Sequence, residues 1–389
     1  MASWRLVPLV LLGLCLVGPA VPAAPPGGRV TVKNALDIAR PSETVVLSGA
    51  GIRKAMAVED LRTVHVTDEA SGKEVLAQAV DLNDDGTFDE VVFQADIGPG
   101  ESRAFALSVG ARHVYTREQF KAYGRFVRER RDDFVWENDR VAHRMYGKAL
   151  ETWAQEPLTS SAVDVWFKRT RRLVANEWYM VDDYHRDLGD GADLYSAGRT
   201  RGCGGNGIWE DGKLYTSANF VESKSIANGP IRVMFALTYP AFDAGGTRVT
   251  EIKRVTLDAG QHFNRFESRY AGAPAVPKAQ AAGIKKHASA LVAQDKARGV
   301  LRTWEPVKAD GSSFGCGIIV DPASLAEFAE ADGNVLAITR LPAGAEVTYY
   351  AGSGWDKGGD FRAVADWDRY LGDAARRMQS PLAVAVTTR

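Results

Sequence analysis

Residues 248–257, RVTEIKRVTL, decide the fold class, because their side chains alternate with the period of a β-strand. One face of this strand carries Val249, Glu251, Lys253 and Val255. The opposite face carries Thr250, Ile252 and Arg254. Both faces hold polar groups, so we expect the strand to border a groove rather than to lie in the core of a sandwich.

Other runs with strand character occur along most of the chain, and turn clusters such as SGAG, NDDG and GPGE separate them. In the N-terminal third these runs are residues 43–47, 62–67, 74–79, 90–95 and 102–109. Their spacing predicts a small antiparallel β-sandwich over residues 28–110. Longer and more polar strands follow in residues 133–389, and we expect a second, larger β-domain there. The predicted fold class is therefore all-β.

Two segments depart from the strand pattern. Residues 111–132 are dense in arginine, which indicates either a solvated linker or short helix, or a basic rim that attracts an anionic substrate. Residues 360–379 have apolar side chains at helical spacing and predict an amphipathic helix with one face toward the core. That face carries Phe361, Val364, Trp367, Leu371, Ala374 and Met378.

Charge and the N-terminal residues limit the partners and the location. The 389-residue chain has a formal net charge of -1, which argues against nucleic acid or an anionic membrane surface as a partner. In residues 1–24, Arg5 precedes an apolar run and then small residues, the layout of a secretory signal peptide. The run is too short for a permanent membrane anchor. We expect a periplasmic or secreted protein.

Removal of that leader leaves two cysteines, Cys203 and Cys316. A disulfide is permitted outside the cytoplasm, but sequence alone does not place two distant cysteines within bonding distance. Paired and free cysteines both remain open at this point.

The segment DLNDDGTFDEVVF, residues 81–93, resembles a calcium loop. Its oxygen-bearing side chains belong to Asp81, Asn83, Asp85 and Asp89. The acid that closes an EF-hand would fall at Val92, so that ligand is absent. A hairpin turn rich in Asx residues explains the same letters, and a structural calcium is the alternative. We expect no other cofactor.

Four of the histidines are candidates for either a structural or a catalytic role. His65 falls in the small sandwich, where we expect a structural role, and His113 falls in the linker. His143 and His185 lie on or beside polar strands of the large domain, where a lone histidine is usually a hydrogen-bonded core residue. His185 departs from that expectation because Tyr184 and several acids surround it in sequence, and an acid can orient an imidazole as a general base.

The stretch YHRDLGDGADLYSAGRTRGCGGNGIWEDGKLY, residues 184–215, combines many glycines with aromatic, basic and acidic side chains. It contains neither a phosphate-binding loop nor a serine-hydrolase elbow. Its candidate site residues are Arg199, Arg201, Asn206, Trp209, Glu210, Lys213 and Tyr215. Aromatic platforms with polar groups suit sugars, and arginine adds recognition of a carboxylate. A well-packed turn with surface charge is the plain alternative. Lys168 and Trp178 are further binding candidates.

These segments resemble a bacterial family of secreted domains of unknown function found beside genes for the breakdown of pectin, ulvan and other uronate polysaccharides. The likeness covers most of the mature chain, and its motifs are WENDRVAHRMYG, SSAVDVWFKRT, the stretch 184–215, EIKRVTLDAGQHFNRFESRY and YYAGSGWDKGGDF. The resemblance implies a galactose-mutarotase-type supersandwich behind a small β-domain. It also implies, for some members, dehydration of glucuronate-containing oligosaccharides.

The predicted reaction is β-elimination on a uronate-containing oligosaccharide, with loss of water or of a glycosidic oxygen. Arg201, with Arg199 or Lys213 beside it, is predicted to neutralise the substrate carboxylate. His185 is the predicted base, with His143 as the alternative.

The acid is expected among Tyr184, Tyr215 and Glu210. Trp209 and Trp178 are expected to stack on sugar rings. A glycoside hydrolase that uses Glu210 with Asp182 or Asp187 is one alternative. A non-catalytic carbohydrate-binding domain is another, and epimerisation is a third that rests on fold analogy alone.

Overall fold

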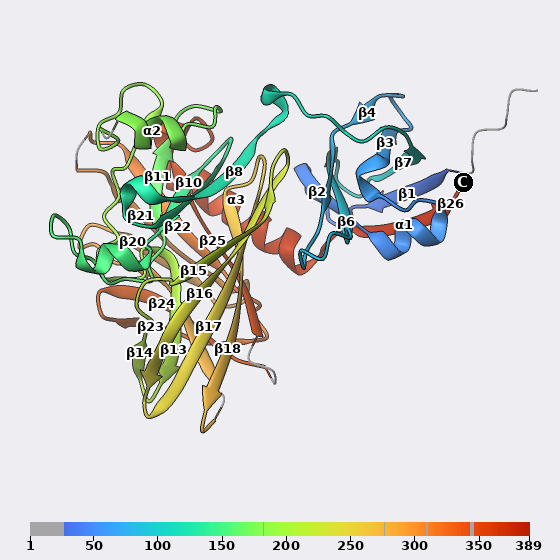
Figure 1. The fold of residues 1–389 in the computed structure, drawn as a ribbon. Helices are drawn as coiled ribbons and strands as arrows, with labels where there is room; N and C mark the ends of the chain where they lie inside the picture. Colours follow the sequence, from blue (N-terminus) through green and yellow to red (C-terminus); the bar gives the residue numbers. More distant parts are fainter. Residues whose placement is uncertain (1–26, 182, 276, 309, 343–345) are drawn as a thin grey trace, which may run out of the picture.

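A computed structural model describes residues 27–181, 183–275, 277–308, 310–342 and 346–389. The predicted signal peptide lies outside these residues. The chain forms two β-lobes of unequal size, joined by the linker that follows β7 and by the helix α3 (Val364–Gln379) (Figure 1). No helix within the described ranges is long and apolar enough to cross a membrane.

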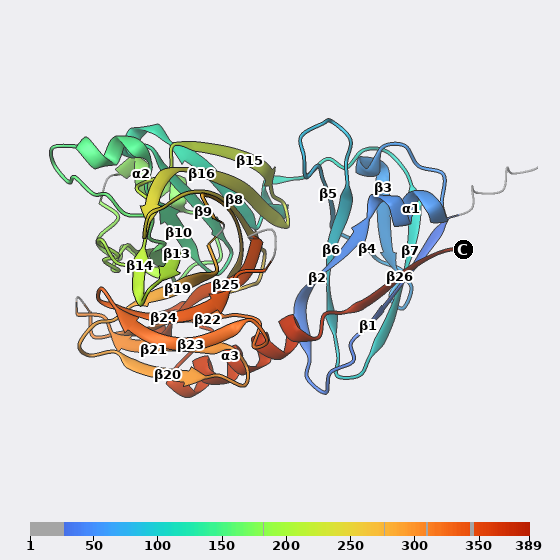
Figure 2. The ribbon, with the colours of Figure 1, turned by 90° about the horizontal axis from the view of Figure 1, so that it is seen from below.

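The smaller lobe is a sandwich of two antiparallel sheets, with strand orders β26-β1-β7-β3-β4 and β2-β6-β5 (Figure 2). Its elements are β1 (Gly28–Lys33), β2 (Arg40–Ser48), α1 (Gly49–Ala55), β3 (Val64–Asp68), β4 (Glu74–Val75), β5 (Ala77–Val80), β6 (Glu90–Ile97), β7 (Ser102–Val109) and β26 (Ala383–Thr388). Alternation buries Val30 and Val32 completely, so each strand turns one face toward the core between the sheets.

The last strand of this sandwich comes from the other end of the chain. β26 pairs antiparallel with β1, from Gly28 opposite Thr388 to Lys33 opposite Ala383. The expected division assigned residues 133–389 as a whole to the larger domain. The structure instead returns the C-terminal strand to the N-terminal sheet.

The larger lobe is a supersandwich built on an eight-stranded sheet in the order β15-β16-β17-β18-β25-β22-β21-β20. These strands are β15 (Glu222–Asn228), β16 (Arg232–Ala244), β17 (Thr247–Asp258), β18 (Phe263–Ala273), β20 (Leu291–Asp295), β21 (Val300–Pro306), β22 (Ser313–Ile319) and β25 (Glu346–Trp355). Together with the small sandwich, this sheet confirms the predicted all-β fold class.

Two five-stranded sheets contact this sheet, in the orders β12-β11-β10-β9-β8 and β14-β13-β19-β24-β23. Their strands are β8 (Ala122–Val127), β9 (Asp133–Asn138), β10 (Ala142–Met145), β11 (Asp164–Lys168), β12 (Gly191–Ala192), β13 (Cys203–Glu210), β14 (Lys213–Tyr215), β19 (Ala279–Lys285), β23 (Leu325–Ala331) and β24 (Asn334–Arg340). One hydrophobic core runs between all three sheets. β8 lies inside the predicted Arg-rich linker of residues 111–132, so 6 residues of that segment belong to a sheet.

The amphipathic helix is confirmed as α3, which packs on β21 and β22 of the large sheet. Trp367 and Leu371 are buried there against Phe263. Pro381 follows the helix, which ends at Gln379, and proline is common just beyond a helix end because it does not continue the helix.

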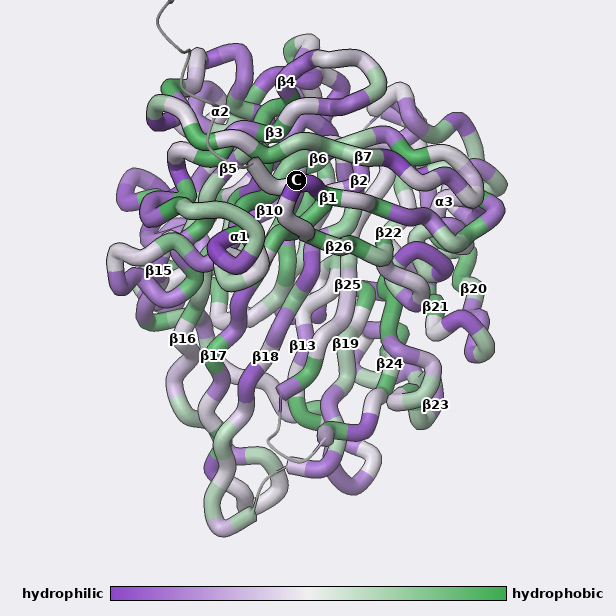
Figure 3. Tube along the Cα trace, turned by 90° about the vertical axis from the view of Figure 1, so that its right-hand side faces the viewer, coloured by the Kyte–Doolittle hydropathy of each residue, from purple (hydrophilic) through white to green (hydrophobic). Residues whose placement is uncertain are grey.

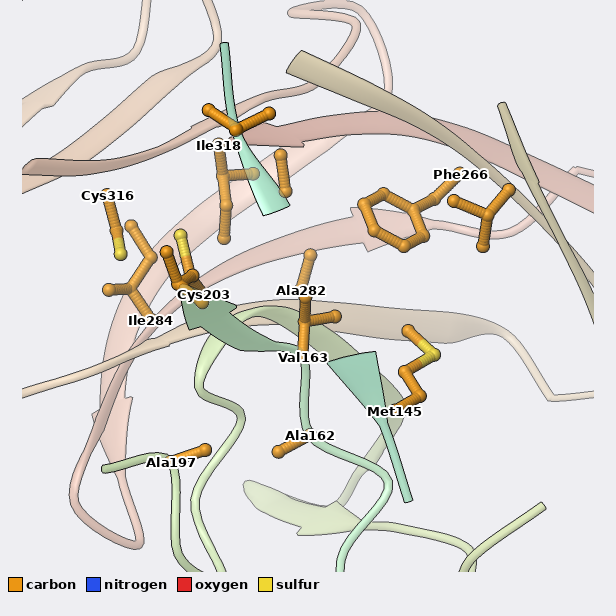
Figure 4. Close-up of a cluster of buried hydrophobic side chains, with 14 of the residues drawn as sticks. Met145, Ala162, Val163, Ala197, Cys203, Phe266, Ala282, Ile284, Cys316 and Ile318 are labelled. Carbon is orange, nitrogen blue, oxygen red and sulfur yellow. The ribbon is translucent and has the colours of Figure 1, made fainter. Parts of the chain in front are cut away.

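Cys203 and Cys316 are both free thiols in this core, where Figure 4 shows them on the same side of the cluster. The thiol of Cys203 donates a hydrogen bond to the carbonyl oxygen of Gly352 at 3.2 Å. The disulfide alternative is therefore not the state that the structure shows.

Glu251 and Lys253, which were expected to border a groove, lie in the interior of the larger lobe. Hydrophilic and hydrophobic residues are mixed along β17 (Figure 3), but Glu251 and Lys253 are 2% and 0% exposed. Both polar groups lie inside the supersandwich, where the amino group of Lys253 is 3.5 Å from a carboxylate oxygen of Glu251 and other side chains donate to Glu251. Ser268 donates to Glu251 at 2.7 Å, and Asn206 donates at 3.1 Å. A polar group can be buried away from water with little cost in free energy when a hydrogen-bond partner is buried with it.

Candidate functional site

The glycines of residues 184–215 allow backbone segments to lie directly against one another. Gly191 and Gly202 both have positive φ, at 114° and 58°. A Cβ added at Gly191 would lie 1.9 Å from the carbonyl oxygen of Phe167, and one at Gly202 would lie 2.0 Å from that of Val163. Only glycine permits this approach. The two glycines therefore hold the intervening residues close to β11 and the segment before it.

Between them, Asp193 joins a buried ion cluster centred on Arg144 of β10. Nε of Arg144 donates to Asp164 at 2.8 Å, and Nη2 donates to Asp193 at 2.9 Å. The guanidinium also lies 3.6 Å from a carboxylate oxygen of Asp133, and the hydroxyl of Tyr146 donates to Asp164 at 2.9 Å. All five side chains are buried. One cation thus faces three carboxyl groups.

The excess of acids favours protonated carboxyl groups at neutral pH. Burial raises the pKa of Asp133 to about 7, although Arg144 opposes the shift. Burial, with the charge of Asp164 adding to it, raises the pKa of Asp193 well above its usual range. A carboxyl group that keeps its proton near neutral pH can act as a general acid.

His185 lies at the solvent side of this cluster. Its side chain is 62% exposed, and its Nδ1 is 3.2 Å from the carbonyl oxygen and 3.7 Å from a carboxylate oxygen of Asp193. Tyr184 is buried and stacks on Trp166, with ring centroids 4.9 Å apart. The predicted neighbours His185 and Tyr184 are therefore brought to one cluster, with the histidine outside and the tyrosine inside.

A second group of polar side chains lies next to the Arg144 cluster and comes from Tyr195, β19 and β21. Nδ1 of His287 lies 2.6 Å from a carboxylate oxygen of Glu305, which is 2% exposed. The ring of His287 meets that of Tyr195 edge to face, with centroids 6.3 Å apart. Lys285, whose amino group contacts the carbonyl oxygen of Ser196, has its pKa lowered by burial and raised in part by Asp164 and Glu305. Lys285 thus links the two groups.

Several buried polar atoms of this region have no hydrogen-bond partner among the described residues. They are Oδ1 of Asp193, the hydroxyl of Tyr195 and Oε1 of Glu305. Buried polar atoms are nearly always paired, so a concentration of unpaired ones marks a place for ligand or ordered water. We call Asp193, Tyr195, Lys285, His287 and Glu305, with His185, the acid–histidine site.

Three predicted site residues are buried parts of the scaffold. His143 is 0% exposed, and burial, with a smaller effect of His262, lowers the pKa of its imidazole to about 3. Trp178 packs on Trp166. Lys168 donates to Glu137 at 2.6 Å with a fully buried side chain. These contacts assign structural roles to His143, Trp178 and Lys168.

Arg201 and Asn206 also lie in the interior. Arg201 is 2% exposed, donates to Ser161 at 2.9 Å, and has its pKa lowered by burial to about 10. Asn206 belongs to the polar network of Glu251 inside the supersandwich. No hydrogen bond or ion pair in the described part of the chain joins Arg201 to His185. The structure does not bring these two predicted partners together.

The remaining candidates lie on or near the β13–β14 hairpin. Arg199 and Lys213 are exposed, and Glu210 and Tyr215 are half-buried. Trp209 packs partly on the cluster of Ala281, Leu336 and Ile338. β13 pairs with β19, the strand of Lys285, but the hairpin turn follows Glu210, at the opposite end of β13 from the pair of Cys203 and Ile284. No hydrogen bond or ion pair among the described residues joins the hairpin to the acid–histidine site. Asp187, an acid of the hydrolase alternative, pairs with Arg169 at 2.8 Å, and Asp182 lies outside the described residues.

The segment 81–93 forms an Asx-rich turn. Asp81 accepts backbone N–H bonds from Asp84 at 2.7 Å and from Gly86 at 2.8 Å. Asn83 accepts from Asp85 at 2.9 Å, and Asp89 accepts from Leu82 at 2.7 Å. These bonds match the turn interpretation. Structural calcium stays a prediction.

Sequence reasoning missed most of the acid–histidine site. Asp193 and Tyr195 lay inside the quoted stretch but were not singled out, and Lys285 and His287 lay outside it. The signal available was KKH at residues 285–287, a basic pair beside a histidine at the end of a strand. Glu305 had no local signal, because only the pairing of β21 with its neighbours places it in the site.

The fold and this site define an all-β supersandwich protein with a polar, histidine-containing site. A family model described as "Domain of unknown function (DUF4861)" matches residues 32–384, and the chain belongs to that family. It is 31% identical over 373 residues to "Uncharacterized protein P7" of Formosa agariphila, covering 92% of this chain and 93% of that protein.

Solved structures match the chain at low sequence identity. A protein in glycosyl hydrolase family 38 from Enterococcus faecalis matches with a TM-score of 0.50 and 11% identity over 93% of this chain. An alpha-mannosidase from Enterococcus faecalis V583 matches with a TM-score of 0.44 and 12% identity over 93% of this chain. The chain spans about half the length of these two structures, 47% and 46%. The first likeness shows that the fold is one found in carbohydrate-active proteins.

Proposed function

We propose that this protein is a carbon–oxygen lyase that performs β-elimination on uronate-containing oligosaccharides, as a dehydratase or a polysaccharide-lyase type enzyme. The observation that supports it most is the pair of His287 and buried Glu305, with the ring of Tyr195 edge to face against that of His287. A base backed by a carboxylate, next to a proton donor, is what an elimination requires.

The first step removes the C5 proton, which lies alpha to the substrate carboxylate. That proton is only weakly acidic, so a nearby cation must stabilise the charge that spreads onto the carboxylate in the transition state. Lys285 is the cation of the acid–histidine site and takes the role that sequence analysis gave to Arg201. His287 removes the proton through Nε2, while Glu305 holds the ring from the Nδ1 side.

The second step breaks the C4–oxygen bond, and the leaving oxygen needs a proton. Burial raises the pKa of the Tyr195 hydroxyl well above its usual value, so Tyr195 is protonated at neutral pH. It is the proposed donor to the leaving oxygen. His185, exposed at the other side of Asp193, is the second donor. His287 then releases its proton to solvent and the donor takes one proton from solvent, so both groups return to their starting state. The product is an unsaturated uronate plus water or a shortened sugar.

A glycoside hydrolase is the second candidate, and the raised pKa of Asp193 favours it. A hydrolase needs one protonated and one ionised carboxyl group at the scissile bond. Asp193 would be the acid and Glu305 the base or nucleophile, both with an unpartnered oxygen.

Ultraviolet absorbance during digestion of uronate oligosaccharides distinguishes the lyase from the glycoside hydrolase. Elimination creates a conjugated enol ether that absorbs, and hydrolysis creates none. We expect absorbance to rise with the wild-type protein and to rise far more slowly with Tyr195→Phe. Sugar release without absorbance would replace the lyase by the hydrolase. Binding without turnover would leave a carbohydrate-binding domain.

A further inference from the structure

Two histidines and a glutamate converge in the small lobe, far along the chain from the acid–histidine site. His65 lies on β3, Glu74 on β4 and His113 in the linker after β7. One ligand atom from each lies within 4.8 Å of the others. The two imidazole rings are 4.3 Å apart, and Nδ1 of His65 is 2.6 Å from Oε1 of Glu74.

Backbone carbonyl groups orient both imidazoles. Nε2 of His65 is 2.9 Å from the carbonyl oxygen of Ala111, and Nε2 of His113 is 2.8 Å from that of Val64. A carbonyl oxygen only accepts, so Nε2 of each ring carries the hydrogen, and the neutral ring keeps its lone pair on Nδ1. Metal-binding histidines are held in this way by a carbonyl or carboxylate on the other nitrogen.

Two imidazole nitrogens and one carboxylate form the donor set of a borderline divalent transition metal. Zn²⁺ binds nitrogen and oxygen ligands of this kind in tetrahedral sites, whereas Ca²⁺ and Mg²⁺ prefer oxygen alone. Three protein ligands leave a fourth position for water. The side chains of His65 and Glu74 are 23% and 53% exposed, so an ion can enter from solvent.

We propose that His65, Glu74 and His113 form a structural site for Zn²⁺ or a similar divalent transition metal. The bound ion attaches the linker to the edge of the small sandwich, because His113 belongs to the linker and the other two ligands belong to paired strands. The site fixes the path of the chain as it leaves the small lobe.

Titration of the full chain with Zn²⁺ tests this proposal, using protein without a histidine tag and freed of metal by a chelator. We expect one Zn²⁺ per chain, and Co²⁺ in its place to give the visible absorption of a tetrahedral site. Glu74→Gln and His113→Gln should each weaken binding at least about tenfold, because each removes a ligand. Glu118→Gln, an exposed acid of the same linker, is the matched control and should bind like wild type.

Thermal unfolding gives a second test of the metal site. Zn²⁺ should raise the melting temperature of wild type and of Glu118→Gln but not of Glu74→Gln, since an ion that binds only the folded state stabilises it. Wild-type protein that binds no Zn²⁺, or Glu74→Gln that binds it as tightly as wild type, would overturn the proposal. In that case the cluster is a protonated His65 paired with Glu74. If the His113→Gln variant does not fold, Zn²⁺ binding by the Glu74→Gln variant decides between these outcomes.

Discussion

Nδ1 of His287 lies 2.6 Å from Oε2 of Glu305, a carboxylate 2% exposed on a strand next to β22. His287 itself is 35% exposed, so one side of its ring faces a buried acid and the other remains within reach of solvent. This arrangement fixes the direction of the ring and gives the elimination its proposed base.

His287→Asn should lower turnover by about 10²- to 10⁴-fold, the usual contribution of a general base. Glu305→Gln should lower it by a smaller factor, because the ring loses its orientation and remains present. Lys286→Gln is the control, since Lys286 pairs with Glu330 at 2.6 Å outside the site. Initial rates on a uronate oligosaccharide check all three, and equal rates for His287→Asn and wild type would remove His287 from the mechanism.

Arg144→Met should destabilise the protein strongly, because it leaves Asp133, Asp164 and Asp193 without their buried cation. Breaking a buried ion pair on one side costs about 3–5 kcal/mol in the free energy of unfolding. Arg172→Gln removes an exposed pair with Glu177 and should cost less than about 1 kcal/mol. Urea unfolding measures both, and a similar small loss in both variants would contradict the ion cluster.

His143 should make stability fall as the pH falls. The folded state holds its pKa at about 3, below the ordinary value of 6.5, so only the unfolded chain gains a proton as pH decreases through 6.5. The stabilisation is fully present above that value and is lost below it. Between pH 7 and pH 5 the loss from this residue is about 2 kcal/mol. His143→Gln should lose that much less over the same range, measured as unfolding free energy at each pH, and identical slopes would refute a buried neutral histidine.

Cys203 and Cys316 should resist alkylation in the native protein and react at both positions after unfolding. Both are free and buried in the core of the supersandwich. Burial is also the first cause of the pKa of Cys316 lying well above its usual value, and a protonated thiol reacts slowly. Peptide mapping after alkylation checks this, with Cys203→Ser as the reference for assigning sites. A disulfide-linked peptide from the purified protein would be contrary to the structure.

Much of the fold followed from the sequence because local patterns carry it. The alternation in residues 248–257 and the apolar spacing in residues 360–379 each predicted one element correctly. The position of β26 did not follow, since only its pairing with β1, across the whole chain, assigns it to the small lobe.

The candidate site followed only in part. Glycines and polar side chains in one stretch are a local signal, and this signal pointed to residues 184–215. That stretch contains His185, Asp193 and Tyr195 of the site. The burial of Arg201 did not follow from the sequence, because no local signal shows that its guanidinium donates to Ser161 in the interior. In a lobe of three sheets, either face of a strand can be covered by another sheet. The neighbouring residues in sequence therefore do not show which face reaches solvent.

Mass spectrometry of products from a panel of uronate oligosaccharides tests the central claim most directly. The account predicts an unsaturated product, either the substrate less one water or two shorter sugars of which one is unsaturated. Two results would contradict it. One is fragments with one added water and no unsaturation. The other is that folded wild-type protein leaves every member of the panel unchanged.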